Sequence, residues 1–247
     1  MSSLYNPANQ NRVLELLTLL RPQSMRHNSK IRLGNEYDGG YVVPLAALRC
    51  DAIISIGVGP DVSFDLALAQ HGAQVVQFDH TVEKSPIEHP AFSFFKKGWG
   101  PRTEGELLSL ADIDATLPAE CQHKLLKFDI EGAEYDIFES LTHTDMAQYE
   151  IICCELHLFD RLNDPSFFAK VEHLLRTLHK GHAPVHLHAN NYMGFIMAEG
   201  VPIPNVLEIT YLRRDLDSFT GPSHEPIPGP LDRPNNPYKP DLCLNPF

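Results

Sequence analysis

Two glycines separated by one residue, Gly57 and Gly59, follow an apolar run over 52–56. Glycines at the carboxyl end of a buried strand let the backbone turn sharply and approach a ligand, because no Cβ obstructs it. Asp79 ends the next apolar run, where a carboxylate can accept hydrogen bonds from both hydroxyls of a ribose. The pattern predicts a site for a nucleoside cofactor; the alternative is a tight strand-to-helix turn with an exposed aspartate.

The glycine loop lacks the features of a pyrophosphate site. Pro60 has no amide N–H at the position where a dinucleotide fold directs backbone donors at phosphate. The third glycine of a G-x-G-x-x-G pattern is absent, since Phe64 and Asp65 stand in its vicinity. Nothing in the loop favours binding of a phosphate.

Polar residues also end three further apolar runs. Asp129 and Glu131 follow one run, and His188 lies near the end of another. Glu155 and His157 lie two residues apart near the end of the run between them, so they share one face of a strand. In open α/β sheets ligands bind outside the carboxyl ends of the strands, which makes all of these residues candidates for a site.

Two other segments are candidates for the cofactor site, each with a structural alternative. Asp38 and Gly39 lie in a turn-like pattern that is either a surface hairpin or a segment folded over the glycine loop. Trp99 is the only tryptophan of the chain. Its ring either stacks on a purine or fills the edge of the core.

The composition limits the classes of partner. A formal net charge of -12 argues against nucleic acid or an anionic membrane as the main partner, since both recruit Lys and Arg. A cationic or neutral small molecule suits this charge better. The five cysteines lack CxxC spacing, which predicts reduced thiols. No signal-peptide pattern and no apolar run of about 18 residues is found, so we expect a cytoplasmic protein without a membrane span.

The order of the elements predicts an α/β fold. The expected strands span 52–56, 75–79, 91–95, 124–128, 150–159, 184–192 and 206–212, with helices over 9–20, 135–141 and 167–178. The last two strands are joined without room for a helix, which favours an open, mostly parallel sheet with an antiparallel last strand. We expect one domain over 1–217 and a Pro-rich extension over 218–247. From Thr220 on, the prolines predict a tail without secondary structure of its own, which either wraps the body or is disordered.

Four motifs in this order resemble a known family. They are Asp38-Gly39-Gly40-Tyr41-Val42, Ile56-Gly57-Val58-Gly59, Lys127-Phe128-Asp129-Ile130-Glu131-Gly132-Ala133-Glu134 and Val206-Leu207-Glu208-Ile209-Thr210-Tyr211. Together, over roughly 31–214, they resemble the FkbM-type class I S-adenosylmethionine-dependent methyltransferases. The Asp-Ile-Glu-Gly-x-Glu run is the most specific of the four.

The resemblance implies a Rossmann-like, seven-stranded methyltransferase sheet with helices on both faces. It also implies transfer of a methyl group from S-adenosylmethionine to an oxygen of a sugar or small molecule. Gly57 and Gly59 would then lie against the donor, Asp79 on its ribose, and Asp129 and Glu131 near its methionine part. Asp38, Gly39 and Trp99 are further candidate donor contacts.

An alcohol acceptor has to lose a proton, and two routes are open. His157 or His188 can act as the base, unless each is a buried neutral histidine bonded to the backbone. Alternatively, Asp129, Glu155 and His157 can offer mixed oxygen and nitrogen ligands to a divalent ion that acidifies the hydroxyl. The alternative to a metal site is that Glu155 forms an ion pair with a lysine or arginine.

Two alternative functions from other classes of protein remain. An NAD(P)-dependent oxidoreductase also needs glycines and an acidic residue at the second strand, but Pro60 and the missing third glycine count against it. The second alternative is a binding module that keeps the fold but has no catalytic activity. In that case the polar residues at the strand ends would have no catalytic role. The sequence leaves the acceptor and the oligomeric state open.

Overall fold

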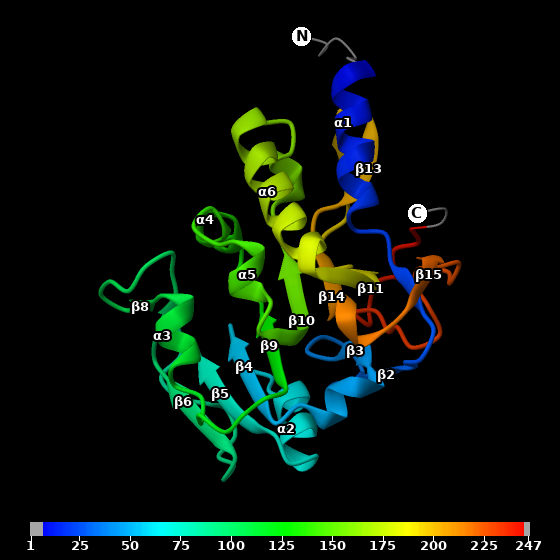
Figure 1. Cartoon of the computed structure of the whole chain (residues 1–247). Coiled ribbons are helices and arrows are strands. Elements are labelled where there is room, and N and C mark those ends of the chain that lie inside the picture. Colours follow the sequence, from blue (N-terminus) through cyan, green and yellow to red (C-terminus); the bar gives the residue numbers. More distant parts are fainter. Residues whose placement is uncertain (1–6, 245–247) are drawn as a thin grey trace.

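The structure, a computed structural model, describes residues 7–244 and is built on a seven-stranded sheet (Figure 1). The strand order is β11-β14-β10-β9-β4-β5-β6. The strands span His182–Ala189 (β11), Leu207–Arg213 (β14), Tyr149–Leu156 (β10), Lys124–Phe128 (β9), Ala52–Ile56 (β4), Gln74–Phe78 (β5) and Phe92–Phe95 (β6). The α/β class and the sheet predicted from the sequence are confirmed.

Strand β14 is antiparallel to both of its neighbours, β10 and β11, while every other pairing in the sheet is parallel. A parallel sheet covered on both faces needs strands that are apolar throughout, and all five residues of β4 are buried. The expected antiparallel last strand is therefore confirmed. Because β4, β5, β9 and β10 run the same way, their carboxyl ends lie at one edge of the sheet.

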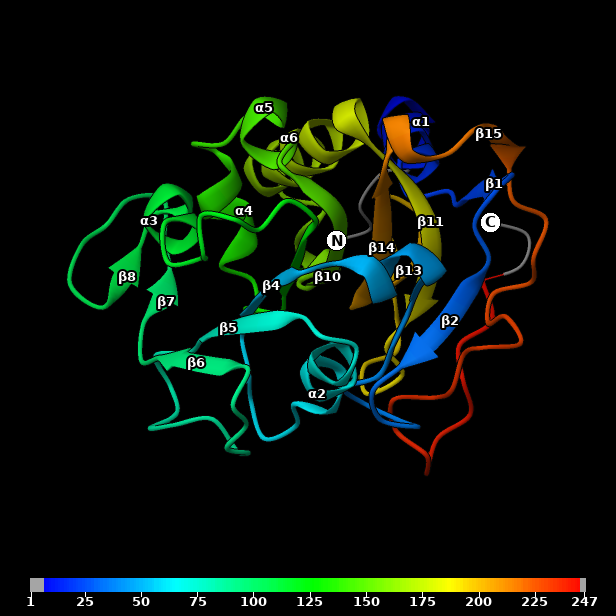
Figure 2. The same cartoon turned by 60° about the horizontal axis from the view of Figure 1, so that its bottom comes forward.

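Helices cover both faces of the sheet, and each face has its own apolar core (Figure 2). One face carries α3, α4, α5 and α6, which span Leu110–Asp114, Glu134–Phe138, His143–Met146 and Pro165–Gly181. The other face carries α2 (Ser63–Gln70), the 3-10 helix Leu45–Arg49 and a hairpin of β2 (Lys30–Leu33) and β3 (Tyr41–Pro44). The Rossmann-like layering predicted from the resemblance is observed.

Smaller elements complete the described chain. Helix α1 (Pro7–Thr18) buries Val13 and Leu16 in the first core, and a hairpin of β12 (Phe195–Ala198) and β13 (Val201–Pro204) joins β11 to β14. The short strands β7 (Gly98–Trp99) and β8 (Leu107–Leu108) pair with each other. Within 7–244, every helix is too short or too polar to cross a bilayer.

The proline-rich extension departs from our expectation at its start. Phe219–Pro222 forms β15, which pairs antiparallel with β1 (Gln23–Met25). The prediction of no secondary structure there was wrong, because a backbone pairing with a strand almost two hundred residues away leaves no local signal. The following residues, 223–244, which we call the C-terminal tail, wrap the body and bury side chains such as Ile227 and Leu244 (Figure 2).

Candidate functional site

A cleft of about 620 Å³ lies at the carboxyl ends of β4, β5 and β9. This volume is within the range of about 300 to 1,000 Å³ that small-molecule sites occupy. The lining residues include eight of the predicted ones: Asp38, Gly39, Gly57, Gly59, Asp79, Trp99, Asp129 and Glu131. All residues predicted to bind the cofactor thus line a single cleft.

The two glycines of the loop are needed for different reasons. Both have positive φ, 76° at Gly57 and 57° at Gly59, which L side chains rarely adopt. A Cβ on Gly57 would lie 1.7 Å from the backbone oxygen of Asp129, so this glycine lets β4 and β9 approach at their ends. A Cβ on Gly59 would meet no atom within 4 Å, which leaves the backbone there open to a ligand.

Asp79 holds the glycine loop through its carboxylate. Oδ2 accepts from the amides of Val58 and Gly59 at 3.0 and 3.2 Å, and Oδ1 accepts from the amide and hydroxyl of Thr81 at 2.8 and 2.6 Å. Burial alone would raise the pKa of Asp79, but these hydrogen bonds outweigh it and the pKa is lowered. These hydrogen bonds therefore favour the ionised carboxylate and hold the side chain in place.

The structure combines the two alternatives for the hairpin, and it places the tryptophan at the edge of the core. Asp38 and Gly39 lie in the turn between β2 and β3, and that hairpin turn lines the cleft. Trp99 packs edge-on against Phe128 and Phe138 at centroid distances of 5.4 and 5.9 Å. It fills the edge of the core and also lines the cleft, and its indole N–H is buried without a hydrogen-bond partner among residues 7–244.

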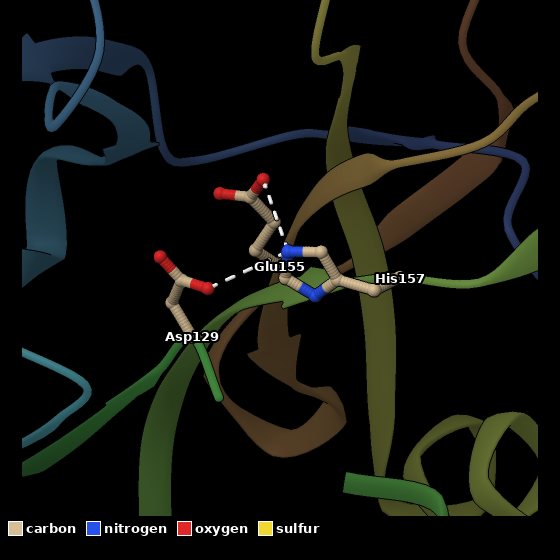
Figure 3. Close-up of side chains that lie close together, drawn as sticks. All are labelled: Asp129, Glu155 and His157. Atoms are coloured by element: carbon tan, nitrogen blue, oxygen red, sulfur yellow. Dashed lines mark ion pairs between the residues drawn. The ribbon is translucent and has the colours of Figure 1, made fainter. Parts of the chain in front are cut away.

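Asp129, Glu155 and His157 converge beside this cleft from the ends of β9 and β10 (Figure 3). His157 Nε2 lies 3.7 Å from Asp129 Oδ1 and 3.5 Å from Glu155 Oε1. The side chain of Glu131, which is 83% exposed, approaches the same nitrogen at 3.4 Å. Three carboxylates thus surround Nε2, and a fourth, that of Glu134, lies 3.6 Å from Nδ1. Asp129 belongs both to this cluster and to the cleft wall.

The backbone of His157 is held by two side chains from the segment around α4. Its N–H donates to Glu134 Oε1 at 3.0 Å, and its carbonyl accepts from the Tyr135 hydroxyl at 2.5 Å. Glu131 and Leu158 beside the cluster have φ of 56° and 62°, which costs a non-glycine residue about 1 to 3 kcal/mol. Glu199, in the turn between β12 and β13, has a positive φ of 46° as well.

Electrostatics favour protonation of the cluster. Burial alone would lower the pKa of His157, but the nearby carboxylates of Glu134, Asp129 and Glu131 outweigh burial and raise it. Burial, with the charges of Asp129 and Glu208, raises the pKa of Glu155 well above its ordinary value. A cation bound among these groups would oppose both shifts, because it stabilises carboxylates and repels an imidazolium.

His188 lies apart from this cluster. Its ring contacts Glu208 Oε2 at 3.1 Å through Nδ1 and the Asp241 carboxylate at 3.1 Å through Nε2. Burial opposes the charged form, but these two carboxylates raise the pKa of His188 to about 10. The ring joins β11 and β14 to the C-terminal tail and does not line the cleft.

Four residues of the site were missed by the sequence analysis. Glu134 is fully buried and bonds the backbone of His157; its signal was a third carboxylate in the motif that begins at Asp129. Lys127 donates to the Gly57 carbonyl at 2.5 Å, and its signal was a lysine inside an apolar strand. Asn235 of the C-terminal tail donates a hydrogen bond to Glu208, and no local sequence pattern predicted that contact.

Solved structures resemble the fold at low sequence identity. A chain of the fibrillarin/Nop5p complex is 9% identical, over 78% of this chain and 98% of that chain, with a TM-score of 0.39. The precorrin-6y C5,15-methyltransferase of Geobacter metallireducens is 11% identical, over 86% and 93%, with a TM-score of 0.31. A 16S rRNA (adenine(1408)-N(1))-methyltransferase of Catenulisporales acidiphilia is 10% identical, over 75% and 98%, with a TM-score of 0.33. At such values these proteins do not identify an acceptor.

Sequence comparison is more decisive. The chain matches no curated protein with significant similarity. The family model described as the methyltransferase FkbM domain matches residues 27–184, well over half of the 247 residues. The match includes the glycine loop, Asp79, Asp129, Glu155 and His157. This chain therefore belongs to the FkbM methyltransferase domain family.

Proposed function

We propose that the protein is an S-adenosylmethionine-dependent O-methyltransferase that acts on a hydroxyl of a sugar or another small molecule. The observation that carries the proposal is the position of Asp129. It lines the cleft with Gly57 and Gly59, and it also faces His157. A methyl donor in the cleft and a group that accepts a proton therefore stand next to each other.

The residues of the cleft fit a donor with a ribose and a positive charge. The open backbone at Gly59, in the loop that Asp79 holds in place, suits the nucleoside, and Asp38 and Asp129 suit a cation. When bound, S-adenosylmethionine supplies a methyl group on a cationic sulfonium. The contribution of this chain is to orient both reactants, which is worth about 7 to 11 kcal/mol where the geometry is right.

His157 is the proposed base for the acceptor hydroxyl. In its neutral form Nε2 takes the proton, and the carboxylates of Asp129 and Glu131 stabilise the imidazolium that results. The bonds from Glu134 and Tyr135 to its backbone keep the ring in place. A base positioned in this way adds about 10² to 10⁴ in rate.

The charge of the chain supports a small acceptor over nucleic acid. The formal net charge is -12, and the described cleft wall carries one lysine, Lys127, beside several carboxylates. Lys127 is tied to the Gly57 carbonyl. A nucleic-acid backbone would meet repulsion at such a surface.

Thermal shift with four ligands tests this function. S-adenosylmethionine and its demethylated product S-adenosylhomocysteine should each raise the Tm, since a ligand at a hundredfold its Kd adds about 2.7 kcal/mol. NAD and NADP should leave the Tm unchanged. A shift with the dinucleotides alone would favour the oxidoreductase, and binding of the donor without transfer to any of a panel of sugars, phenols and hydroxy acids would favour the silent module.

A divalent ion is the second proposed route to acceptor activation. Asp129, Glu155 and His157 offer ligand atoms that all lie within 4.8 Å of one another, and Asp129 Oδ1 is buried without a hydrogen-bond partner among residues 7–244. Two carboxylates and one imidazole suit Mn²⁺ or Mg²⁺. The ion would lower the pKa of a bound hydroxyl.

We expect Mn²⁺ to raise the Tm of the wild type and to leave that of Glu155→Gln nearly unchanged, since the variant lacks one charged ligand. Isothermal titration with Mn²⁺, Mg²⁺ and Zn²⁺ measures the same effect without any turnover. His186→Ala, which removes a buried histidine outside the cluster, serves as the control and should retain the shift. Full turnover after exhaustive chelation, with no ion detected by titration, would end this route.

A further inference from the structure

The C-terminal tail places one amide at the edge of the donor cleft. Asn235 is 2% exposed, although its segment forms no helix or strand. Its Nδ2 donates to Asp38 Oδ1 at 3.1 Å and to Glu208 Oε1 at 2.6 Å. One side chain therefore joins a carboxylate of the cleft wall to a buried carboxylate of β14.

The same contact reaches the surroundings of His157. Glu208 lies directly opposite Glu155 in the pairing of β10 and β14, and both are buried. Glu155 accepts from Asn190 Nδ2 at 2.8 Å, and Glu208 accepts from Asn235. Two carboxyl groups this close cannot both ionise without cost, and each accepts a hydrogen bond from an amide, while Glu208 also contacts His188.

Contacts on both sides fix Asn235 in place. Before it, Asp232 Oδ1 lies 2.7 Å from His186 Nε2 on β11. After it, Asn236 N donates to Asn191 Oδ1 at 2.7 Å, and Asp241 contacts His188. The tail is thus anchored to the sheet at several points, and Asn235 is the one of these anchors that bonds a residue of the donor cleft.

We propose that Asn235 is a positioning residue of the methyl-donor site, which fixes the Asp38 carboxylate at the cleft wall. The proposal rests on the proposed function, because it takes the cleft as the donor site. Asp38 is exposed, so without the amide its side chain would lose rotational freedom on binding a ligand. Because the matched domain ends at residue 184, the tail supplies a part of the site that lies outside it.

Titration with S-adenosylhomocysteine tests the proposal in three variants of the full chain. Asn235→Asp keeps the shape of the side chain but replaces the donor Nδ2 by an acceptor between two carboxylates. We expect the Kd to rise about tenfold or more. The donor KM should rise with it while kcat at saturation stays near the wild-type value, since Asn235 bonds none of the residues that contact His157.

The double variant Asn235→Asp/Glu208→Gln separates positioning from folding. Its net charge equals that of the wild type, and the amide of residue 208 can donate a hydrogen bond to the carboxylate of residue 235. The Tm should therefore recover. Asp38 still faces a carboxylate, so the Kd should stay high. Asp232→Asn, which weakens another anchor of the tail, should keep the Kd within about twofold of the wild type.

The outcomes separate this proposal from the function on which it rests. If the wild type does not bind S-adenosylhomocysteine, the proposed function fails. If the wild type binds and Asn235→Asp binds equally well, or if Tm and Kd recover together in the double variant, Asn235 has a structural role alone. An equal loss in Asp232→Asn would likewise overturn the specific role of Asn235. Should Asn235→Asp fail to fold, the double variant carries the test.

Discussion

Replacing Gly57 with alanine is expected to abolish donor binding and to destabilise the protein by on the order of 3 kcal/mol. The added Cβ would lie 1.7 Å from the Asp129 carbonyl oxygen, and φ at this position is 76°. The positive φ costs about 1 to 2 kcal/mol, and forcing β4 and β9 apart costs about 1 to 3 kcal/mol more. For a chain of this size the Tm should fall by about 6 to 12 °C.

Gly59→Ala is the matched control for this prediction. Gly59 also has positive φ, 57°, but its Cβ would meet no atom within 4 Å. The cost is then the backbone term alone, about 1 to 2 kcal/mol, so the Tm should fall less than in Gly57→Ala. Calorimetric scans of both variants with titration of S-adenosylhomocysteine measure the difference. Equal Tm losses in the two variants would show that the approach of Gly57 to Asp129 is not the constraint.

The fold was largely predictable because parallel strands covered on both faces leave continuous apolar runs in the sequence. The run at β4 and the glycines after it located the first strand end, and the missing helix between β11 and β14 predicted the antiparallel strand. Strand β15 was not predictable, since its partner β1 lies almost two hundred residues away. The composition of Phe219–Pro222, with a glycine and a proline, does not suggest a strand.

The site was predictable where it depends on strand ends. Asp129, Glu155 and His157 follow neighbouring parallel strands, so the spacing was enough to bring them together. The separation of His188 was not predictable, because β14 runs the other way and the tail covers that end of β11. Asn235 meets Asp38 across 197 residues of sequence, and no period or motif encodes such a contact.

His157→Ala is expected to lower turnover by about 10² or more while leaving the Kd for S-adenosylhomocysteine nearly unchanged. The imidazole lies 3.7 Å from Asp129 Oδ1, and it does not line the cleft. The loss should therefore appear in kcat and not in donor binding. His186→Ala is the control, since His186 is also buried beside a carboxylate, that of Asp232, but lies outside the cluster.

The pH profile identifies the role of His157. A base has to be neutral, so activity falls as pH drops through its pKa. Burial alone would move the pKa below 6.5, but the carboxylates of Glu134, Asp129 and Glu131 raise it. The acidic limb of kcat/KM should therefore lie above 6.5 in the wild type and should vanish from the residual activity of His157→Ala. A folded variant that keeps wild-type turnover, or the same acidic limb, would make His157 a core histidine whose carboxylate neighbours serve the fold alone.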